Sequence, residues 1–383
     1  MEKNHWITFI SISLFLLLNH SFFGQKDHSY TLGDTTGKYH FSIGLLGGSI
    51  VPHRAAMQNV ITGHSAGVSI QYLHRPPHQF WRMYQNNPID GWDLYFSTTG
   101  NPNQLGYQTA ISYILYRRVP LFHSSRLWWG TGLGLGYTNL TWDLYQNHQA
   151  PILSTHLNAA MIIHLQYECW RFKKSNLCVG MRITHLSNGA YQLPNLGTNN
   201  IQLTLTHQPR MTLPKGRYSY ICILPSFMSS RILSIQGAMG IKETYQPLGK
   251  KYPVWNAQVT YAHRINDRHR WIIGLDYLNQ PALKKLWWEY KGVQATPIQS
   301  MQLGLNLGFQ TIFGNTWFSI HQGCYIFSPW KENGALYHRL SLRRNFKMSS
   351  YGASRTYLYA ALFTHFAKAD HFEFGLGWDI TKR

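Results

Sequence analysis

The sequence predicts an all-β protein, an antiparallel transmembrane β-barrel, from three observations. Short runs of alternating apolar and polar residues, rich in aromatic residues and Gly, recur between turn residues along the chain, as is typical of membrane strands. Residues 1–25 have the form of a secretory signal, with Lys3 before an apolar run over 7–18. No later segment approaches the length of apolar chain that a transmembrane helix needs. An exported chain that crosses a membrane with strands indicates the outer membrane of a Gram-negative cell.

The alternating runs predict two successive sets of strands. The first set is expected at 39–50, 64–75, 91–99, 105–117, 126–141, 154–169, 175–187 and 200–209. The second set is expected at 217–228, 231–244, 253–265, 269–279, 299–313, 316–328, 334–346 and 356–381, the last dividing into a hairpin. A sheet in lipid must close, because unpaired edge groups are costly there.

Three short matches in the same order indicate an internal duplication. They pair GKYHFSI (37–43) with GRYSYIC (216–222), GVSIQYLHR (67–75) with NAQVTYAHR (256–264), and LCVGMRITHL (177–186) with LYAALFTHF (358–366). We therefore expect a signal peptide over 1–25, a first eight-stranded barrel repeat over 26–210 and a second repeat over 211–383. Two small barrels and one larger barrel are both compatible with this pattern.

Composition narrows the class of partner. The formal net charge is +20, yet an exported chain without a nucleic-acid motif is not expected to bind nucleic acid. Anionic lipid head groups are the expected counter-charge, and paired basic residues such as Arg343–Arg344 are read as girdle and turn residues. Four cysteines are too few for a disulfide framework, although Cys169 and Cys178 could bridge a hairpin. The scattered histidines predict no metal site and no cofactor.

The segment 176–188 carries the clearest candidate chemistry. Alternate side chains of a strand face opposite sides, so His185 and Ser187 extend an apolar stripe, whereas Arg182 and Thr184 belong to a polar stripe from which only Leu186 deviates. The stripes indicate lipid outside and a polar interior. A histidine and a serine side by side near the membrane surface are the pair that a serine hydrolase of lipids requires.

Over THLSNGAYQLPNLGTNN (184–200) the chain resembles the lipid A 3-O-deacylase (PagL-type) family, also described as acyloxyacyl hydrolases. The shared signature is HxSN at the end of a strand, a short Asn/Pro/Gly-rich turn, and a third catalytic residue at the start of the next strand. The resemblance implies an eight-stranded outer-membrane barrel that removes an ester-linked acyl chain from lipid A without a metal. It implies Ser187 as nucleophile, His185 as general base and Asn199 as third member, with Asn188, Asn195 and Gly197 holding the oxyanion.

The third member departs from the family, because Asn199 stands where the family has a glutamate. An amide can orient an imidazole by accepting from its N–H but cannot stabilise imidazolium by charge. Glu168, on the neighbouring strand, has interior parity and is a poor substitute. In the second repeat His365 aligns with His185, but Ala367 and Lys368 replace Ser187 and Asn188, so this half is expected to be structural.

The sequence thus favours an outer-membrane serine esterase acting on lipid A, lipopolysaccharide or a related glycolipid. A non-enzymatic barrel that kept the fold and lost the acid is the alternative, and a small passive pore is a third. Trp128–Trp129, Trp287–Trp288 and Trp378 are read as anchors at the membrane interface.

Overall fold

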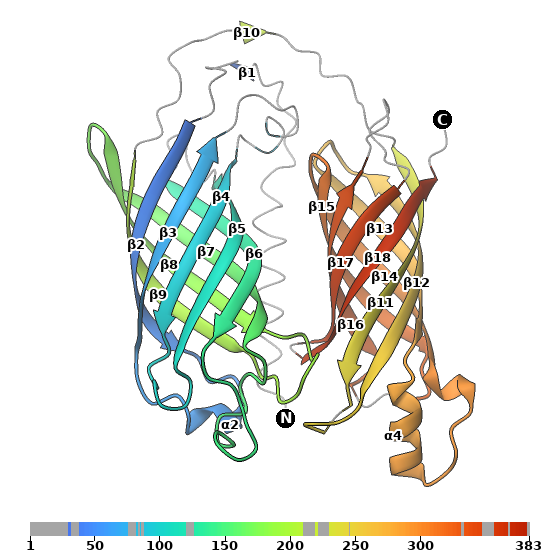
Figure 1. Cartoon of the computed structure of the whole chain (residues 1–383). Helices are drawn as coiled ribbons and strands as arrows, with labels where there is room; N and C mark the ends of the chain where they lie inside the picture. The colour runs from blue at the N-terminus through green and yellow to red at the C-terminus, as the bar shows by residue number, and fades with distance from the viewer. Residues whose placement is uncertain are drawn as a thin grey trace. The chain divides into compact units, whose positions relative to one another are not determined.

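The computed structural model describes residues 30–31, 38–75, 82, 85, 88–119, 126–209, 219–220, 230–244, 246–330, 333–346, 356–366 and 368–380, and every structural statement concerns these residues. The predicted signal segment 1–25, Cys222 and Ala367 lie outside them. Two closed, antiparallel, eight-stranded barrels make up the fold, which confirms the predicted all-β class (Figure 1). The sequence was compatible with two small barrels or with one larger barrel, and the chain forms two small ones. Among the described residues, no helix is long and apolar enough to span a membrane.

The first barrel closes by pairing its first strand with its last. Its strands are β2 (Lys38–Ile50), β3 (Ser65–Arg75), β4 (Ile89–Thr98), β5 (Tyr107–Arg118), β6 (Leu127–Thr138), β7 (Leu157–Arg171), β8 (Ser175–Ser187) and β9 (Thr198–Pro209). A short helix, α2 (Ala55–Gln58), lies between β2 and β3. All eight strands coincide with predicted ones to within a few residues, because the period-two pattern is strong in this half.

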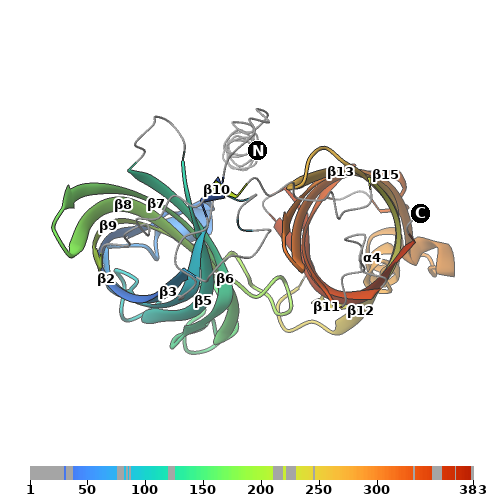
Figure 2. The same ribbon diagram turned by 90° about the horizontal axis from the view of Figure 1, so that it is seen from above.

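The second barrel closes in the same way, through β11 and β18 (Figure 2). Its strands are β11 (Arg231–Glu243), β12 (Lys251–Arg264), β13 (His269–Asn279), β14 (Met301–Phe313), β15 (Thr316–Phe327), β16 (Leu336–Asn345), β17 (Thr356–His365) and β18 (Lys368–Ile380). The connection from β13 to β14 carries α4 (Ala282–Lys291) and η1 (Pro297–Ser300). Outside both barrels, β1 (Tyr30–Thr31) pairs with β10 (Ser219–Tyr220).

Two of the three repeat matches join equivalent strands, since β3 and β12 are second in their barrels and β8 and β17 are seventh. The match of 37–43 with 216–222 is wrong, because the second barrel begins only at Arg231. The predicted strand 217–228 is likewise not one of the eight, and only Ser219–Tyr220 of it are described. Short motifs of Gly, Tyr and Ser arise by chance in a chain of this composition.

The walls of both barrels are amphipathic in the sense predicted from the alternation. On β2, for example, Phe41, Ile43 and Leu45 are exposed, whereas Ser42 and Leu46 between and beside them are buried. Large apolar side chains are exposed on most of the other strands as well. An apolar outer surface around a polar interior is the pattern of a barrel whose outside contacts lipid.

A buried ion pair occupies the interior of the first barrel. The Arg182 guanidinium makes two hydrogen bonds to the Asp93 carboxylate, at 3.0 and 2.7 Å, and neither side chain is exposed. Gln71 donates to the same carboxylate at 2.9 Å, and Arg182 lies 4.7 Å from the centroid of the Tyr95 ring. The polar stripe therefore fills an eight-stranded barrel with paired charges and hydrogen bonds instead of leaving a channel.

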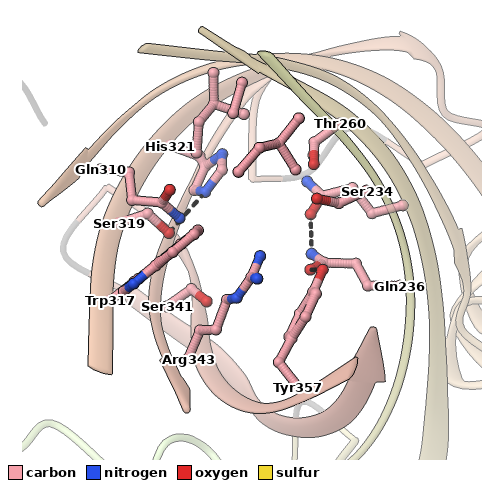
Figure 3. A pocket seen from close by; sticks show the side chains of 14 residues that line it. Ser234, Gln236, Thr260, Gln310, Trp317, Ser319, His321, Ser341, Arg343 and Tyr357 are labelled. Carbon is pink, nitrogen blue, oxygen red and sulfur yellow. Dashed lines mark hydrogen bonds between the residues drawn. The ribbon is translucent and has the colours of Figure 1, made fainter. Parts of the chain in front are cut away.

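The interior of the second barrel is filled in the same manner. Arg339 is paired with Glu373 and, at 3.3 Å, with Asp276, and Arg343 is paired with Asp379. A small cavity lies beside Arg343 and is lined mostly by polar side chains (Figure 3). Its volume is about 30 Å³, which has room for only one or two water molecules. A cavity of this size is too small to hold a solute much larger than water.

At one end of the first barrel, the connecting loops pack on one another. A buried apolar cluster joins Met57 and Val60 of the β2–β3 loop, Leu105 of the β4–β5 loop and Ile152 of the β6–β7 loop to Leu186 of β8. This explains why Leu186 breaks the polar stripe. It points inward at the strand end, where the interior contains apolar loop residues instead of polar ones. The cluster makes this end of the barrel a rigid support.

The suggested Cys169–Cys178 bridge is wrong, since both cysteines are free. The β7–β8 register shifts between Glu168 and Trp170, which leaves Cys169 in a bulge without a cross-strand partner. Cys178 pairs instead with Glu168 and is fully buried. Cys324 is also free and lies exposed on β15.

Two expectations about surface residues also fail. Trp128 is a buried interior residue, not an interface anchor, and its indole N–H donates to Glu168 at 2.6 Å. Arg343 belongs to the interior ion pair and not to a girdle. Trp288 is exposed but lies on α4, a helix that the strand pattern did not predict, whereas Trp378 faces outward on β18 as expected. The sequence next to Trp128 and Arg343 therefore does not determine whether each side chain points to the lipid or to the interior of its barrel.

We expect Asp93→Asn to destabilise the first barrel by about 3–5 kcal/mol, because it leaves the buried Arg182 charge without its counter-charge. The measurement is the shift of the urea unfolding midpoint in detergent micelles. The matched control is Glu289→Gln, which breaks a partly exposed pair with Lys285 on α4 and is expected to cost about 0.5 kcal/mol or less. Equal shifts for the two variants would contradict the prediction.

Candidate active site

The predicted pair lies at the end of β8, on the face that was expected. His185 and Ser187 share the parity of the outward-facing Val179 and Met181. His185 is half-buried, and Ser187 is only 8% exposed. The lower exposure of Ser187 follows from its place beside the β8–β9 turn, where Asn195 contacts it.

The structure brings His185 and Asn199 together. The two residues are cross-strand partners in the β8–β9 register, and His185 Nδ1 lies 2.7 Å from Asn199 Oδ1. Cross-strand partners project to the same face of a sheet, so the register of the hairpin itself aligns the amide with the imidazole. The amide of Asn199 therefore lies against the imidazole of His185, as the predicted pairing of these two residues requires.

Ser187 is held by a second amide. Asn195 Nδ2 donates to Ser187 Oγ at 2.9 Å, while Asn195 Oδ1 accepts from the Asn188 backbone N–H at 3.2 Å. The second contact fixes the orientation of the amide, because a backbone N–H can only donate. Asn195 therefore presents a donor group next to the serine oxygen, where a substrate oxyanion would develop.

The predicted oxyanion donors Asn188 and Gly197 are engaged elsewhere. The Asn188 side-chain amide donates to Ser154 Oγ at 3.2 Å, and the Gly197 N–H donates to the Ile152 carbonyl at 3.0 Å. Both contacts tie the β8–β9 turn to the β6–β7 loop. Asn195, in contrast, directs its amide N–H at Ser187 Oγ.

Gly197 has a different role, which is to make room for the imidazole. It adopts a left-handed backbone conformation, with φ of 73°. A Cβ at this position would lie 2.9 Å from His185 Cε1 and 3.5 Å from His185 Nε2. A glycine is therefore required both by the backbone of the turn and by the ring that rests against it.

His53 is a site residue that the sequence analysis missed. Its Nδ1 lies 3.1 Å from Asn199 Nδ2, and its Nε2 lies 2.9 Å from the Leu196 carbonyl oxygen. His53 follows β2, and 146 residues separate it from Asn199 in the sequence. No local motif marks it, and closure of the barrel between β2 and β9 places it beside Asn199.

Glu168 is unsuited to replace the missing acid, as its parity predicted. It is buried inside the barrel, where it accepts from Trp128 and is paired with Arg171 at 2.6 Å. Its cross-strand partner is Cys178, whereas that of His185 is Met161. Within the described part of the chain, no group of three or more His, Cys, Asp and Glu side chains could hold a metal ion.

The second barrel has no equivalent arrangement at His365. This residue is buried and faces the interior of the barrel, where Tyr325 contacts it at 3.0 Å. The sequence alignment of His365 with His185 is therefore wrong, because the two side chains point to opposite faces of their strands. It requires a one-residue gap, and a one-residue shift moves a side chain to the opposite face of a strand.

The fold and the site together define a β-barrel of the outer-membrane type with a Ser–His–Asn constellation on its wall. Residues 65–208 match the family described as "Lipid A 3-O-deacylase (PagL)". Residues 231–382 match the family described as "Acyloxyacyl hydrolase, C-terminal domain". The chain belongs to the lipid A 3-O-deacylase family, in agreement with the resemblance seen around His185. Both descriptions are those of hydrolases.

No curated protein matches the chain. Among solved structures, a triple mutant of the Rhodopseudomonas blastica porin matches with 9% identity, covering 90% of this chain and 99% of the porin, with a TM-score of 0.17. CdiB from Acinetobacter baumannii matches with 12% identity, covering 90% of this chain and 60% of CdiB, with a TM-score of 0.18. At these scores the matches carry no argument about function.

We expect Gly197→Ala to slow the reaction of Ser187 with a fluorophosphonate probe at least tenfold. The alanine Cβ would meet the His185 ring and strain a left-handed backbone, which costs roughly 1–2 kcal/mol by itself. Gly292→Ala is the matched control, since Gly292 has φ of 66° but nothing within 4 Å of its added Cβ. The interpretation of Gly197 is wrong if both variants label at the rate of the unmodified protein.

Proposed function

We propose that this protein is an outer-membrane serine esterase that hydrolyses an ester-linked acyl chain of lipid A or a related glycolipid. The observation that carries the proposal is the 2.7 Å contact between His185 Nδ1 and Asn199 Oδ1, beside a serine on the same outer face of β8. Membership of the deacylase family supports the substrate class. The apolar outer wall and the net charge of +20 suit a protein among anionic lipids.

The chemistry follows from the hydrogen bonds around the two residues. A serine hydroxyl is a weak nucleophile until a base takes its proton. Asn199 Oδ1 accepts from His185 Nδ1–H, which leaves the lone pair on Nε2 as the base. Two residues along a strand span about 7 Å, so the Ser187 hydroxyl must turn from Asn195 toward the imidazole when substrate binds. Such tightening on substrate binding is common for catalytic hydrogen bonds.

The reaction then proceeds in two balanced steps. Ser187 Oγ attacks the ester carbonyl as its proton passes to His185, and the Asn195 amide stabilises the negative charge on the carbonyl oxygen. The intermediate expels the sugar hydroxyl, which takes the proton from His185 and leaves an acyl group on Ser187. Water then attacks the acyl carbonyl as its proton passes to His185. The intermediate expels Ser187 Oγ, which regains the proton from His185, and the fatty acid is released.

The substrate class fits the location of the site. Ser187 is the last residue of β8, and strand ends of a membrane barrel lie near the lipid–water boundary. The ester linkages of a glycolipid lie at that boundary, between the sugar and the acyl chains. An acyl chain can therefore remain in the apolar phase along the barrel wall while its ester contacts Ser187.

We expect Ser187→Ala to abolish deacylation of lipid A while the barrels still fold. The measurement is mass spectrometry of purified lipid A in detergent micelles after incubation with each protein, with heat-modifiable gel migration as the test of folding. Loss of one hydroxyacyl mass is expected with the unmodified protein alone. Persistent loss of this mass with the variant would refute the serine mechanism. No loss with either folded protein would favour a non-enzymatic barrel, in which Asn199 in place of a glutamate has left the site inactive.

We expect Asn195→Ala to lower kcat for the same substrate by about 10²–10³, the usual effect of removing one oxyanion donor. KM should change little, because the donor acts on charge that develops in the transition state. Asn188→Ala is the informative comparison, since the Asn188 side-chain amide donates to Ser154 Oγ. A larger loss of kcat for Asn188→Ala than for Asn195→Ala would reverse the assignment.

A further inference from the structure

The site contains a continuous chain of hydrogen-bonding groups that the family signature does not include. It runs from the Leu196 carbonyl to His53 at 2.9 Å, from His53 to Asn199 at 3.1 Å, and from Asn199 to His185 at 2.7 Å. Asn199 is the link at which the family's glutamate is replaced. A neutral residue can orient His185 from this position only if the amide oxygen of Asn199, and not its NH₂ group, faces the imidazole.

The direction of each hydrogen bond follows from the Leu196 end. A backbone carbonyl can only accept, so His53 Nε2 must carry a hydrogen. The neutral imidazole of His53 then has an acceptor at Nδ1, and the group of Asn199 that faces it must be the donating NH₂. Asn199 Oδ1 is thereby directed at His185, whose Nδ1 must carry the hydrogen. The basic nitrogen of His185 is then Nε2, the nitrogen that a general base requires.

We propose that His53 is a positioning residue that takes over the orienting role of the missing carboxylate by fixing the Asn199 amide. The inference rests on the proposed esterase function of Ser187 and His185. A carboxylate needs no such help, because either of its oxygens accepts from an imidazole N–H. An amide offers an acceptor on one side and a donor on the other. Turned by 180°, Asn199 would donate to His185 Nδ1 and move the hydrogen to Nε2.

Backbone pairing and loop packing hold His53 in place without using the side chains of the triad. The Val51 N–H donates to the Asn199 carbonyl at 2.9 Å, which extends the β2–β9 pairing beyond Ile50. After His53, the loop is anchored by Met57 and Val60 in the apolar cluster at this end of the barrel. Both the backbone before His53 and the loop after it are therefore fixed relative to Asn199.

The test compares His53 variants in two backgrounds, with Asn or Glu at position 199. His53→Phe keeps a ring but removes the acceptor, whereas His53→Asn places an acceptor oxygen close to the position of the imidazole Nδ1. Against micellar lipid A, His53→Phe should lower kcat at least tenfold with KM nearly unchanged, and His53→Asn should recover most of this loss. In the Asn199→Glu background, His53→Phe should change kcat by less than about threefold. Such non-additivity is the sign of coupled residues.

A second readout does not depend on turnover. The ¹⁵N chemical shifts of the His185 ring should report a hydrogen on Nδ1 in the unmodified protein and a shift toward the Nε2–H form in His53→Phe. In Asn199→Glu combined with His53→Phe, the Nδ1–H form should return.

The outcomes separate the two proposals. Equal losses for His53→Phe in both backgrounds, or an unchanged His185 tautomer, would overturn the role of His53 and leave the esterase proposal standing. Activity that appears only after Asn199→Glu would overturn both the role of His53 and the esterase function proposed for the unmodified protein. Absence of deacylation by every variant, with a His185 tautomer that still depends on His53, would instead refute the esterase function while the positioning network remains.

Discussion

The requirement that every strand edge be paired governs this structure. In lipid an unpaired backbone N–H or C=O costs several kcal/mol, and the chain meets this requirement twice, through β2–β9 in the first barrel and β11–β18 in the second. Closure fixes which face of each strand is outside, so the apolar stripes face outward and the polar stripes are enclosed. It also brings the end of β2 against the start of β9. The candidate active site depends on this second consequence, because His53 and Asn199 belong to those two strands' ends.

Both barrels neutralise the charges of their polar interior with buried ion pairs. Eight strands enclose a space that side chains can fill, and here arginines paired with carboxylates occupy it, with Arg182 and Asp93 in one barrel and Arg339 and Glu373 in the other. Arg343, which the sequence pattern assigned to a membrane girdle, is likewise internal and paired with Asp379. The wide channel that a single sixteen-stranded closure would produce does not exist in a chain that closes as two narrow barrels.

A neutral residue, Asn199, lies against the imidazole at the candidate site. It shares the β8–β9 register with His185 and contacts it at 2.7 Å, but its amide brings no negative charge to the ring. Asn195 is oriented by the Asn188 N–H, and Asn199 by His53, so each amide at the site has one atom fixed by a group of known polarity. The orientation of both amides is thus determined by the protein framework and not by substrate.

The sequence by itself determined what depends on neighbouring residues. The period-two alternation located the strands of both barrels, the parity of Ser187 and His185, and the unsuitable position of Glu168, while the HxSN signature identified the family. Tertiary structure decided what depends on distant residues. The number of barrels, the use of the Gly197 N–H by Ile152 and the presence of His53 at the site all arise from contacts between separate loops and strands. The orientation of His365 was predicted wrongly for the same reason. A one-residue gap in an alignment moves a strand side chain to the opposite face of the sheet, and only the register between strands shows which face it occupies.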